Sequence, residues 1–345
     1  MIDIKKFFKI LFFNTILFLL FLIIFELLFG YFLKKNNFGF LMRSERQKSK
    51  IYEVIHNNQK YRFSYKRNFY GFRGDDVKPS EIKIVFEGGS TGNQKFTPEE
   101  LTIVGLLNNK LNQLIPSLKI INASTDGKTV RGYSNDFKYW FPKLNNFNPK
   151  YIIFYTGIND ADINQAEKFD SPWREDTFLK ILDYIKNNSK LVELLKKVKF
   201  KYFNKEIHKK YGMTKINDKL YKDYIYIDYQ TAIKKNKNNK VNLELVQQFE
   251  ERLELLNYYI NSYNFIPIFI TQVMYNGLEN YGLFQINETL KKFCKKNNYS
   301  IIKLDEMIND LEINSFYDIA HTTPKGNKVI ADKIFSRLIE IINKN

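Results

Sequence analysis

Four short segments of the sequence contain residue types that suit acyl transfer. They are Gly88-Gly89-Ser90-Thr91, Asn122-Ala123-Ser124-Thr125-Asp126-Gly127, Gly157-Ile158-Asn159-Asp160 and Asp318-Ile319-Ala320-His321. In this order they supply a hydroxyl, a glycine that lets a ligand approach the backbone, a carboxamide, and an imidazole with a carboxylate. Attack on an acyl carbonyl needs such a set: a nucleophile, a base, a group that orients the base, and donors for the oxyanion.

Each group has a distinct role in this hypothesis. The Ser90 hydroxyl is the candidate nucleophile, and His321 takes its proton near neutral pH. Asp318 bonds to the other ring nitrogen of His321 and fixes its tautomer. The backbone N–H groups of Ser90 and Gly127 and the side-chain amide of Asn159 are the candidate oxyanion donors. Taken singly, each residue has an ordinary alternative, such as a turn glycine, a cap or a surface histidine. The four segments in this order favour the catalytic interpretation.

Ser90 directly follows a stretch that is typical of a buried strand. Residues 82–86 are apolar except Lys83, and Glu87 and two glycines follow them. Ligand and catalytic groups of open α/β sheets collect at the carboxyl ends of strands, which is where this serine would lie. The turn is not a phosphate loop, because Asn93 stands five residues after Gly88 and no Gly-Lys-Ser/Thr follows.

The elements that must position these segments alternate along the chain. We predict strands at residues 82–86, 118–122, 150–156, 264–271 and 299–304, and helices at residues 101–114, 130–144, 283–296 and 324–342. Pro98 is expected at the first helical position of the first of these helices. Strands separated by helices predict a parallel sheet that is covered on both faces. The four segments would then lie along one edge of that sheet.

On these segments the sequence resembles the SGNH hydrolases, also called the GDSL-type esterases and lipases. Members of that family carry a characteristic Ser, Gly, Asn and His in this order, and the matching positions are Ser90, Gly127, Asn159 and His321. Gly132 is the alternative for the glycine. The resemblance covers about residues 81–340. It leaves out the N-terminal segments and a helical insert.

The resemblance implies a three-layer α/β/α, flavodoxin-like core and a serine mechanism without a metal or a cofactor. It assigns Ser90, Asp318 and His321 to a catalytic triad. It also implies ester or O-acyl substrates, since family members act on lipids, acylated sugars, cell-wall glycans and thioesters. Some membrane-anchored members move or remove acetyl groups on extracellular polysaccharide. Two positions depart from the family: Gly89 stands where many members carry Asp, and Glu87 where a small or apolar residue is commoner.

A long apolar run near the N-terminus predicts a membrane anchor. The run extends from Ile10 to Leu33 with lysines on both sides, and it exceeds the roughly 20 residues that span a bilayer. A cleaved signal peptide has a shorter apolar core and a small-residue cleavage site, and a buried core helix would not need the flanking lysines. We therefore predict an uncleaved single-pass helix at about residues 10–33. Glu26 is costly in lipid, but near the end of the run it could reach the interface or a partner helix.

The sequence predicts three parts. Residues 1–35 are the anchor, residues 36–80 a connector with a short strand or turn, and residues 81–345 the hydrolase-like domain. A polar, mostly helical insert at about 161–262 could be a lid, a surface against the membrane, or a layer packed on the sheet edge. Three lysines precede the anchor and six basic residues follow it, so the positive-inside bias read literally would place the large domain in the cytoplasm. However, the whole chain is basic, and long domains translocate largely regardless of charge. The likeness to anchored relatives favours a catalytic domain outside the cytoplasm.

The net charge of +17 would attract anionic phospholipids, acidic glycans or nucleic acid. However, the lysines lie along the whole chain, and no zinc-finger spacing, RNP-like segment or basic-region heptad is present, so no nucleic-acid partner is predicted. One cysteine excludes an internal disulfide. With three histidines, His56, His208 and His321, a histidine-based metal site is not expected. The sequence leaves the oligomeric state open.

The leading hypothesis is a membrane-anchored serine esterase or O-acyltransferase that acts on an acylated glycan or a similar ester. The first alternative is a lysophospholipase-like lipid esterase at the membrane. The second belongs to another class of protein: a catalytically silent, anchored binding module of an envelope assembly. The presence of all four catalytic positions argues against the second alternative.

Overall fold

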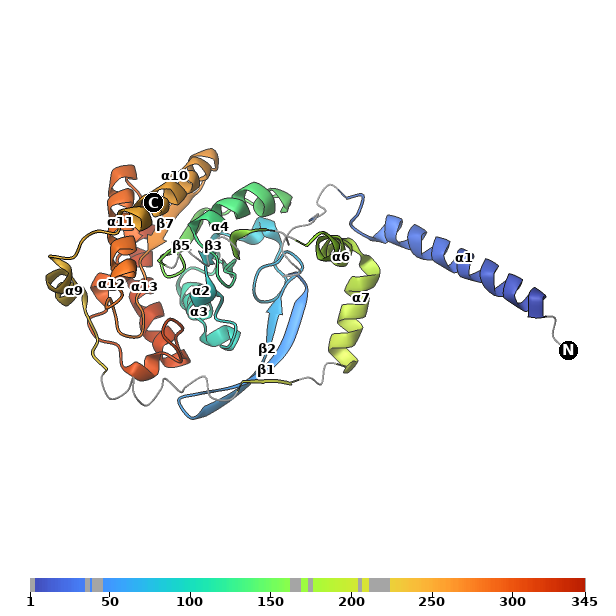
Figure 1. The fold of residues 1–345 in the computed structure, drawn as a ribbon, viewed down its shortest axis with the longest axis horizontal. Helices are drawn as coiled ribbons and strands as arrows, with labels where there is room; N and C mark the ends of the chain where they lie inside the picture. Colours follow the sequence, from blue (N-terminus) through green and yellow to red (C-terminus); the bar gives the residue numbers. More distant parts are fainter. Residues whose placement is uncertain are drawn as a thin grey trace. The chain divides into compact units, whose positions relative to one another are not determined.

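The computed structural model describes residues 4–34, 38, 46–161, 169–172, 176–203, 207–210 and 224–344. The chain divides into two compact units (Figure 1). The N-terminal unit comprises Met1–Ser44 and Trp173–Asn204, and the sheet unit comprises Glu45–Pro172 and Lys205–Asn345. Parts of the predicted connector and insert, residues 35–37, 39–45, 162–168, 173–175, 204–206 and 211–223, lie outside the described residues. The predicted domain boundaries stay a prediction.

The centre of the sheet unit is a five-stranded parallel sheet in the order β4-β3-β5-β7-β8. Its strands are β3 (Ile84–Gly88), β4 (Ile120–Asn122), β5 (Tyr151–Tyr155), β7 (Ile266–Ile270) and β8 (Ser300–Ile302). Counted along the chain, this order is 2-1-3-4-5, the flavodoxin-like arrangement, which confirms the predicted fold class. The strand order reverses between β3 and β5, so the turns after these two strands flank the point where such sheets bind ligands.

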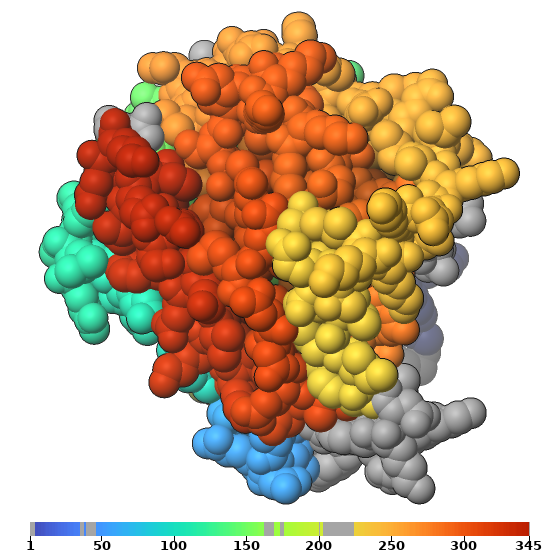
Figure 2. All heavy atoms as spheres, turned by 90° about the vertical axis from the view of Figure 1, so that its left-hand side faces the viewer, coloured from blue at the N-terminus to red at the C-terminus, as the bar shows by residue number. Residues whose placement is uncertain are grey.

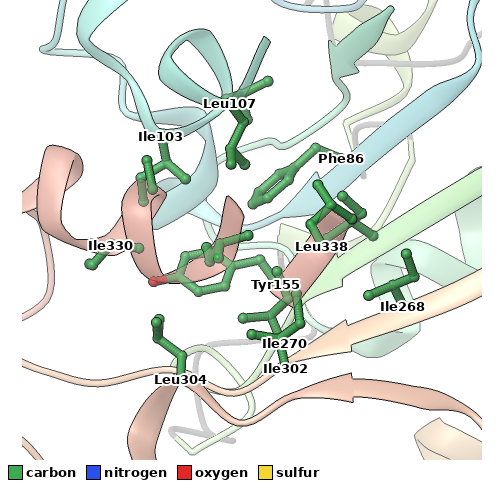
Figure 3. Close-up of a cluster of buried hydrophobic side chains, with 14 of the residues drawn as sticks. Phe86, Ile103, Leu107, Tyr155, Ile268, Ile270, Ile302, Leu304, Ile330 and Leu338 are labelled. Atoms are coloured by element: carbon green, nitrogen blue, oxygen red, sulfur yellow. The ribbon is translucent and has the colours of Figure 1, made fainter. Parts of the chain in front are cut away.

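One face of the sheet is covered by α3 (Ile103–Leu114) and α13 (Pro324–Lys344). Alternate side chains of each strand point to this face, because successive residues of a strand face opposite sides. Figure 3 shows Leu107 of α3 and Leu338 of α13 pointing toward Phe86 of β3. All three side chains are fully buried. This apolar layer is the main core of the unit and fixes both helices on the sheet.

The opposite face is covered by α4 (Val130–Asn135), α10 (Leu243–Ser262) and α11 (Tyr281–Asn297). Aromatic rings fill much of this layer. Phe154 of β5 stacks on Phe269 of β7 with ring centroids 5.0 Å apart, and Tyr133 of α4 lies 5.8 Å from Phe154. Figure 2 shows part of the outer surface, where the orange and red C-terminal helices lie beside the gold segment that includes α9 (Tyr229–Asn236). The sheet unit therefore has the predicted three layers.

Two predicted helices differ from the observed ones. Pro98 does not open α3: it precedes a 3₁₀ turn, Glu99–Leu101, and α3 starts after Thr102, whose hydroxyl accepts a hydrogen bond from the Gly105 N–H at 2.9 Å. The helix predicted at 130–144 is α-helical only as far as Asn135. It continues as a π-helical turn, Asp136–Trp140, and a 3₁₀ turn, Phe141–Lys143. Pro142 lacks the N–H that an α-helix would use at this point.

The region predicted as a connector contains an antiparallel hairpin of β1 (Lys48–His56) and β2 (Gln59–Arg67). A short strand, β6 (Ile207–Lys210), pairs with β1 in parallel. Positive φ angles at Asn57 and Asn58 make the turn, as in the two-residue hairpins that asparagine favours. The polar composition of this region gave no clear alternation, so its pairing was not predicted. The remaining short elements of the sheet unit are Pro79–Glu81, α2 (Ser90–Asn93), α12 (Leu304–Met307) and Ile313–Ser315.

The N-terminal unit contains α1 (Ile4–Phe29), α6 (Thr177–Asn188), α7 (Lys190–Val198) and a π-helical turn at Lys199–Phe203. Helix α1 is 26 residues long, or about 39 Å at the rise of an α-helix. None of its residues is buried. Its length and apolar composition are sufficient to cross a membrane.

Candidate active site

Ser90 lies at the first position of α2, directly after the carboxyl end of β3. The Gly89 carbonyl accepts hydrogen bonds from the N–H groups of Gly92 and Asn93, which closes the helical turn around the serine. At the first position of a helix the backbone N–H has no acceptor within the helix. This N–H and the hydroxyl of Ser90 therefore lie together at the N-terminal end of the turn.

The structure brings Ser90, His321 and Asp318 into one hydrogen-bonded chain. Ser90 Oγ lies 2.7 Å from His321 Nε2, and His321 Nδ1 lies 2.8 Å from Asp318 Oδ2. With its proton on Nδ1, the imidazole donates to Asp318 and accepts from the serine hydroxyl. All three residues are half-buried. This is the geometry in which a histidine can take the proton of a serine that attacks a carbonyl.

Backbone groups and an aromatic ring hold the Asp318–His321 pair in place. Asp318 Oδ1 accepts hydrogen bonds from the N–H groups of Ala320 at 2.9 Å and of His321 at 2.7 Å. Burial by itself would raise the pKa of the Asp318 carboxyl, but the hydrogen bond and charge of His321 and these N–H groups lower it below its usual value. Tyr317 stacks on the imidazole with an interplanar angle of 7°. The carboxylate thus stays charged and the ring is fixed.

Asn159 follows β5, and its amide lies beside the nucleophile turn. Its Nδ2 donates to the Lys128 carbonyl at 2.8 Å. A Cβ on Gly89 would lie 2.1 Å from this Nδ2, so position 89 has no room for a side chain while the amide stays there. This contact gives a physical reason for a glycine at position 89. The hydrogen bond to the Lys128 carbonyl also orients Asn159, because it holds one of the two amide hydrogens.

Gly127 lies in the turn after β4, with a φ of +77°. That turn contacts the nucleophile turn through the hydrogen bond from the Thr125 N–H to the Gly88 carbonyl, at 3.1 Å. Phe169 packs where a Cβ of Gly127 would be, at 2.4 Å, and the ring is 45% exposed. The next residue, Asp170, accepts a hydrogen bond from the Thr129 N–H. Position 127 thus needs glycine for its backbone conformation and for the contact with Phe169. No sequence motif indicated the contact with Phe169.

Gly132, the alternative to Gly127, lies inside α4 and is buried. A Cβ there would lie 2.4 Å from Lys128 Cγ and 2.7 Å from Asp170 Oδ1. Close packing therefore accounts for this glycine. Gly127 is the glycine that occupies the turn beside Ser90.

Glu87 points to the face opposite the main core and is fully buried in an ionic cluster. Its Oε2 accepts a hydrogen bond from Lys128 Nζ at 3.0 Å, and Asp136 bonds to the same ammonium group. Burial raises the pKa of the Glu87 carboxyl although Lys128 opposes the effect. The head of Lys128 is thereby fixed, and its own carbonyl is the acceptor for Asn159. Glu87 supports the site through Lys128.

Two glutamines that the sequence analysis did not name connect the turns of the site. Gln272 donates to Thr91 Oγ1 at 3.1 Å and accepts from the Ile158 N–H at 2.9 Å, so it joins the turns after β3 and β5. Gln94 donates to Thr322 Oγ1 at 3.1 Å and so joins α2 to the loop of the histidine. The position of Gln272, directly after the fourth predicted strand, was the one sequence feature that could have indicated its role. No sequence feature indicated the role of Gln94.

Arginines of the hairpin region hold the far side of the site. Arg73 is 1% exposed and bonds to the carbonyls of Asn93 and Thr97, and Arg67 donates to the Ser124 carbonyl at 2.7 Å. Both guanidinium groups are thus occupied by main-chain acceptors behind the nucleophile turn. Among the residues that the structure describes, no group of three His, Cys, Asp or Glu side chains could hold a metal ion.

A family model for the GDSL-like lipases/acylhydrolases matches residues 74–334. This range includes all four segments of the site and spans most of the sheet unit. The comparison with curated proteins finds no match.

Solved structures with a similar fold were also found. LAE5, an alpha/beta hydrolase enzyme from the metagenome of Lake Arreo, Spain, is 14% identical and has a TM-score of 0.43, with 74% of this chain and 94% of that chain covered. TesA is 10% identical with a TM-score of 0.43, covering 74% and 97%. Axe2, an acetylxylan esterase from Geobacillus stearothermophilus, is 14% identical with a TM-score of 0.42, covering 75% and 95%.

The carboxyl of Asp160, next to Asn159, gives a pH-dependent prediction. Burial raises its pKa to about 7, although Arg252 at 3.2 Å lowers it. The folded protein therefore holds this proton more tightly than the unfolded chain, whose pKa is about 4. The free energy of unfolding should fall as the pH rises from about 4 to about 7. In an Asp160→Asn variant this contribution should be lost.

The measurement is chemical unfolding of wild type and Asp160→Asn in detergent across that pH range. As the pH rises, we expect the free energy of unfolding of wild type to fall steadily relative to that of Asp160→Asn. A difference that stays constant with pH would contradict the raised pKa.

Proposed function

This chain belongs to the GDSL-like lipase/acylhydrolase family, and we propose that its ester-hydrolase chemistry runs through Ser90, His321 and Asp318. The observation that carries the proposal is the continuous hydrogen-bonded line from the Ser90 hydroxyl through the imidazole to the Asp318 carboxylate. A catalytically silent binding module would not need this line. The enzyme class follows from the family; the roles of the three residues are the proposal.

In the first half of the reaction, Ser90 Oγ attacks the acyl carbonyl carbon while His321 Nε2 takes the hydroxyl proton. The tetrahedral intermediate then collapses as His321 gives that proton to the leaving alcohol, which leaves the acyl group on Ser90. Asp318 keeps the ring in the tautomer that accepts at Nε2 and stabilises the imidazolium that forms. The lowered pKa of Asp318 supports this role, because the carboxylate stays charged in mild acid.

The oxyanion of the intermediate is held by the backbone N–H groups of Ser90 and Gly127 and by the Asn159 amide. An amide nitrogen carries two hydrogens. One of those of Asn159 is bonded to the Lys128 carbonyl, and we assign the other to the substrate oxygen. Donors that are fixed before the reaction need no reorganisation during it. In this proposal Glu87 and Lys128 are positioning residues.

In the second half, a water molecule or a sugar hydroxyl attacks the acyl group on Ser90, with His321 as the base. Water gives hydrolysis, and a sugar hydroxyl gives O-acyl transfer. We propose an acylated glycan or a similar ester as the substrate, with Ser90 carrying the acyl group in either case. Support comes from the family resemblance, in which anchored members act on O-acetyl groups of extracellular polysaccharide.

We also propose that α1 remains attached as a single-pass anchor, with the sheet unit outside the cytoplasm. Its length and composition support a membrane span. A further support is Glu26 near its end, which accepts hydrogen bonds from the backbone N–H groups of Lys190 and Leu191. A signal peptide that is cleaved off would have no need for such bonds to a distant part of the mature chain.

A lipid ester is the second candidate substrate. The helices α6 and α7 of the N-terminal unit expose apolar side chains, which favours contact with lipid. To separate the two candidates, the full chain is assayed in detergent with an acetylated oligosaccharide and with a lysophospholipid. We expect the higher kcat/KM for the acetylated sugar. A higher kcat/KM for the lysophospholipid would contradict the glycan and favour a lipid ester as the substrate.

The nucleophile is tested with a short-chain nitrophenyl ester and a fluorophosphonate probe. Wild type should hydrolyse the ester and be labelled by the probe. Ser90→Ala should abolish labelling and reduce kcat/KM by a factor on the order of 10⁶. The matched control is Ser124→Ala, a buried serine of the neighbouring turn that should still be labelled. Labelling of Ser90→Ala at the wild-type level would rule out Ser90.

The link between Gly89 and Asn159 gives a further prediction. Asn159→Ala should reduce kcat by about 10²–10³-fold through loss of an oxyanion donor. Gly89→Ala should also reduce kcat, because its Cβ would displace the Asn159 amide. In the double variant, Gly89→Ala should add little to the loss caused by Asn159→Ala. If the losses of kcat in the two single variants multiplied in the double variant, Gly89 would act independently of Asn159.

A further inference from the structure

Glu26 of α1 binds the start of α7 within the N-terminal unit. Its carboxylate accepts hydrogen bonds from Ser189 Oγ at 2.6 Å and from the N–H groups of Lys190 at 2.9 Å and Leu191 at 3.0 Å. The first N–H groups of a helix lack partners within it and favour a negative charge. Glu26 is the single acidic residue of α1, and here its charge has three donors.

Further contacts join the end of α1 to the same two helices. The Tyr31 N–H donates to the Asn188 carbonyl at 2.8 Å, and its hydroxyl donates to Glu193 at 3.1 Å. Phe32 packs on Tyr184 of α6 with ring centroids 5.8 Å apart. Helices α6 and α7 therefore meet beside the end of the predicted membrane span. For a span of this length, that end lies near the surface of the bilayer.

The two helices present an apolar face that the unit leaves exposed. In α7 the apolar residues are Leu191, Val192, Leu194, Leu195 and Val198, and all of them except Val192 lie at the spacing of one helical face. Leu195 is 65% exposed, and in α6 Phe178 is 68% exposed. The opposite face of α7 is ionic, with Glu193 bonded to Lys190 at 2.9 Å and to Lys197 at 2.7 Å.

The charge of this region suits a surface of anionic headgroups. Residues 176–203 contain seven lysines and three acidic residues, a formal charge of 7 − 3 = +4. An amphipathic helix with lysines and exposed large apolar side chains is typical of segments that lie in the membrane interface. Lysines close to an anionic leaflet are attracted to its headgroups. Apolar and electrostatic contributions thus act together in this segment.

We propose that α6 and α7 lie in the headgroup region of the same bilayer that α1 crosses, with Leu195 and Phe178 in the lipid and Glu26 holding the two helices at the end of the span. This interfacial platform, residues 176–203, rests on the proposed anchor. It goes beyond that proposal, since an anchor alone could leave the platform in water. The occupant of the apolar face is the lipid surface.

The test uses the full chain in vesicles of phosphatidylcholine and phosphatidylglycerol. An environment-sensitive fluorophore is attached at Leu195→Cys, at Lys197→Cys, or at Leu17→Cys, and brominated lipids serve as quenchers. Residues 195 and 197 lie on opposite faces of α7, since one residue turns an α-helix by about 100°. Leu17 reports on insertion of α1. The native Cys294 is buried, and unsubstituted protein gives the background.

We expect lipid quenching at positions 17 and 195 that is several-fold stronger than at position 197, and weaker quenching at 195 when phosphatidylglycerol is omitted. Quenching at 17 without quenching at 195 would overturn the platform and leave the anchor intact. A label at 195 that is shielded from water but not quenched would mean that protein covers this face, which also overturns it. Absence of quenching at 17 would remove the anchor and the platform together.

Discussion

The hydrogen bond between Ser90 Oγ and His321 Nε2 joins two loops that are 231 residues apart in the chain. It requires that β3 and the loop before α13 end at the same edge of the sheet. The parallel register from β4 to β8 provides this edge, and the apolar layer between the sheet and α13 sets where the histidine loop begins.

Around this bond, a series of contacts holds the residues of the candidate site in position. Position 89 requires a glycine, because the Asn159 amide occupies the space that a Cβ would take. Asn159 is held by the Lys128 carbonyl, and the Lys128 ammonium is held by Glu87 and Asp136 in a buried cluster. A buried ionic cluster is costly to form, and here it fixes the residue whose carbonyl holds the proposed oxyanion donor, Asn159. The two departures from the family pattern, Gly89 and Glu87, are therefore parts of one arrangement.

The N-terminal unit follows a different physical rule, that of a single carboxylate near the end of a long apolar helix. A carboxylate near the end of an apolar helix must find donors, and Glu26 finds them at the start of α7. These hydrogen bonds join the end of α1 to two amphipathic helices that lie about 160 residues further along the chain. The same contact thus reduces the cost of the charge and determines where the exposed apolar face of α6 and α7 begins.

The sequence by itself determined the alternation of strands and helices, the sheet type and the family, because apolar periodicity and short turn motifs are local signals. It also named Ser90, Asn159, Asp318 and His321, since each directly follows a predicted strand or precedes a predicted helix. Only the tertiary structure decided the partners of Glu87 and Glu26, the cover of Phe169 over Gly127, and the linking roles of Gln94 and Gln272. These depend on contacts between residues that are far apart in the chain, and a polar side chain carries no local sign of which distant donor or acceptor it will meet.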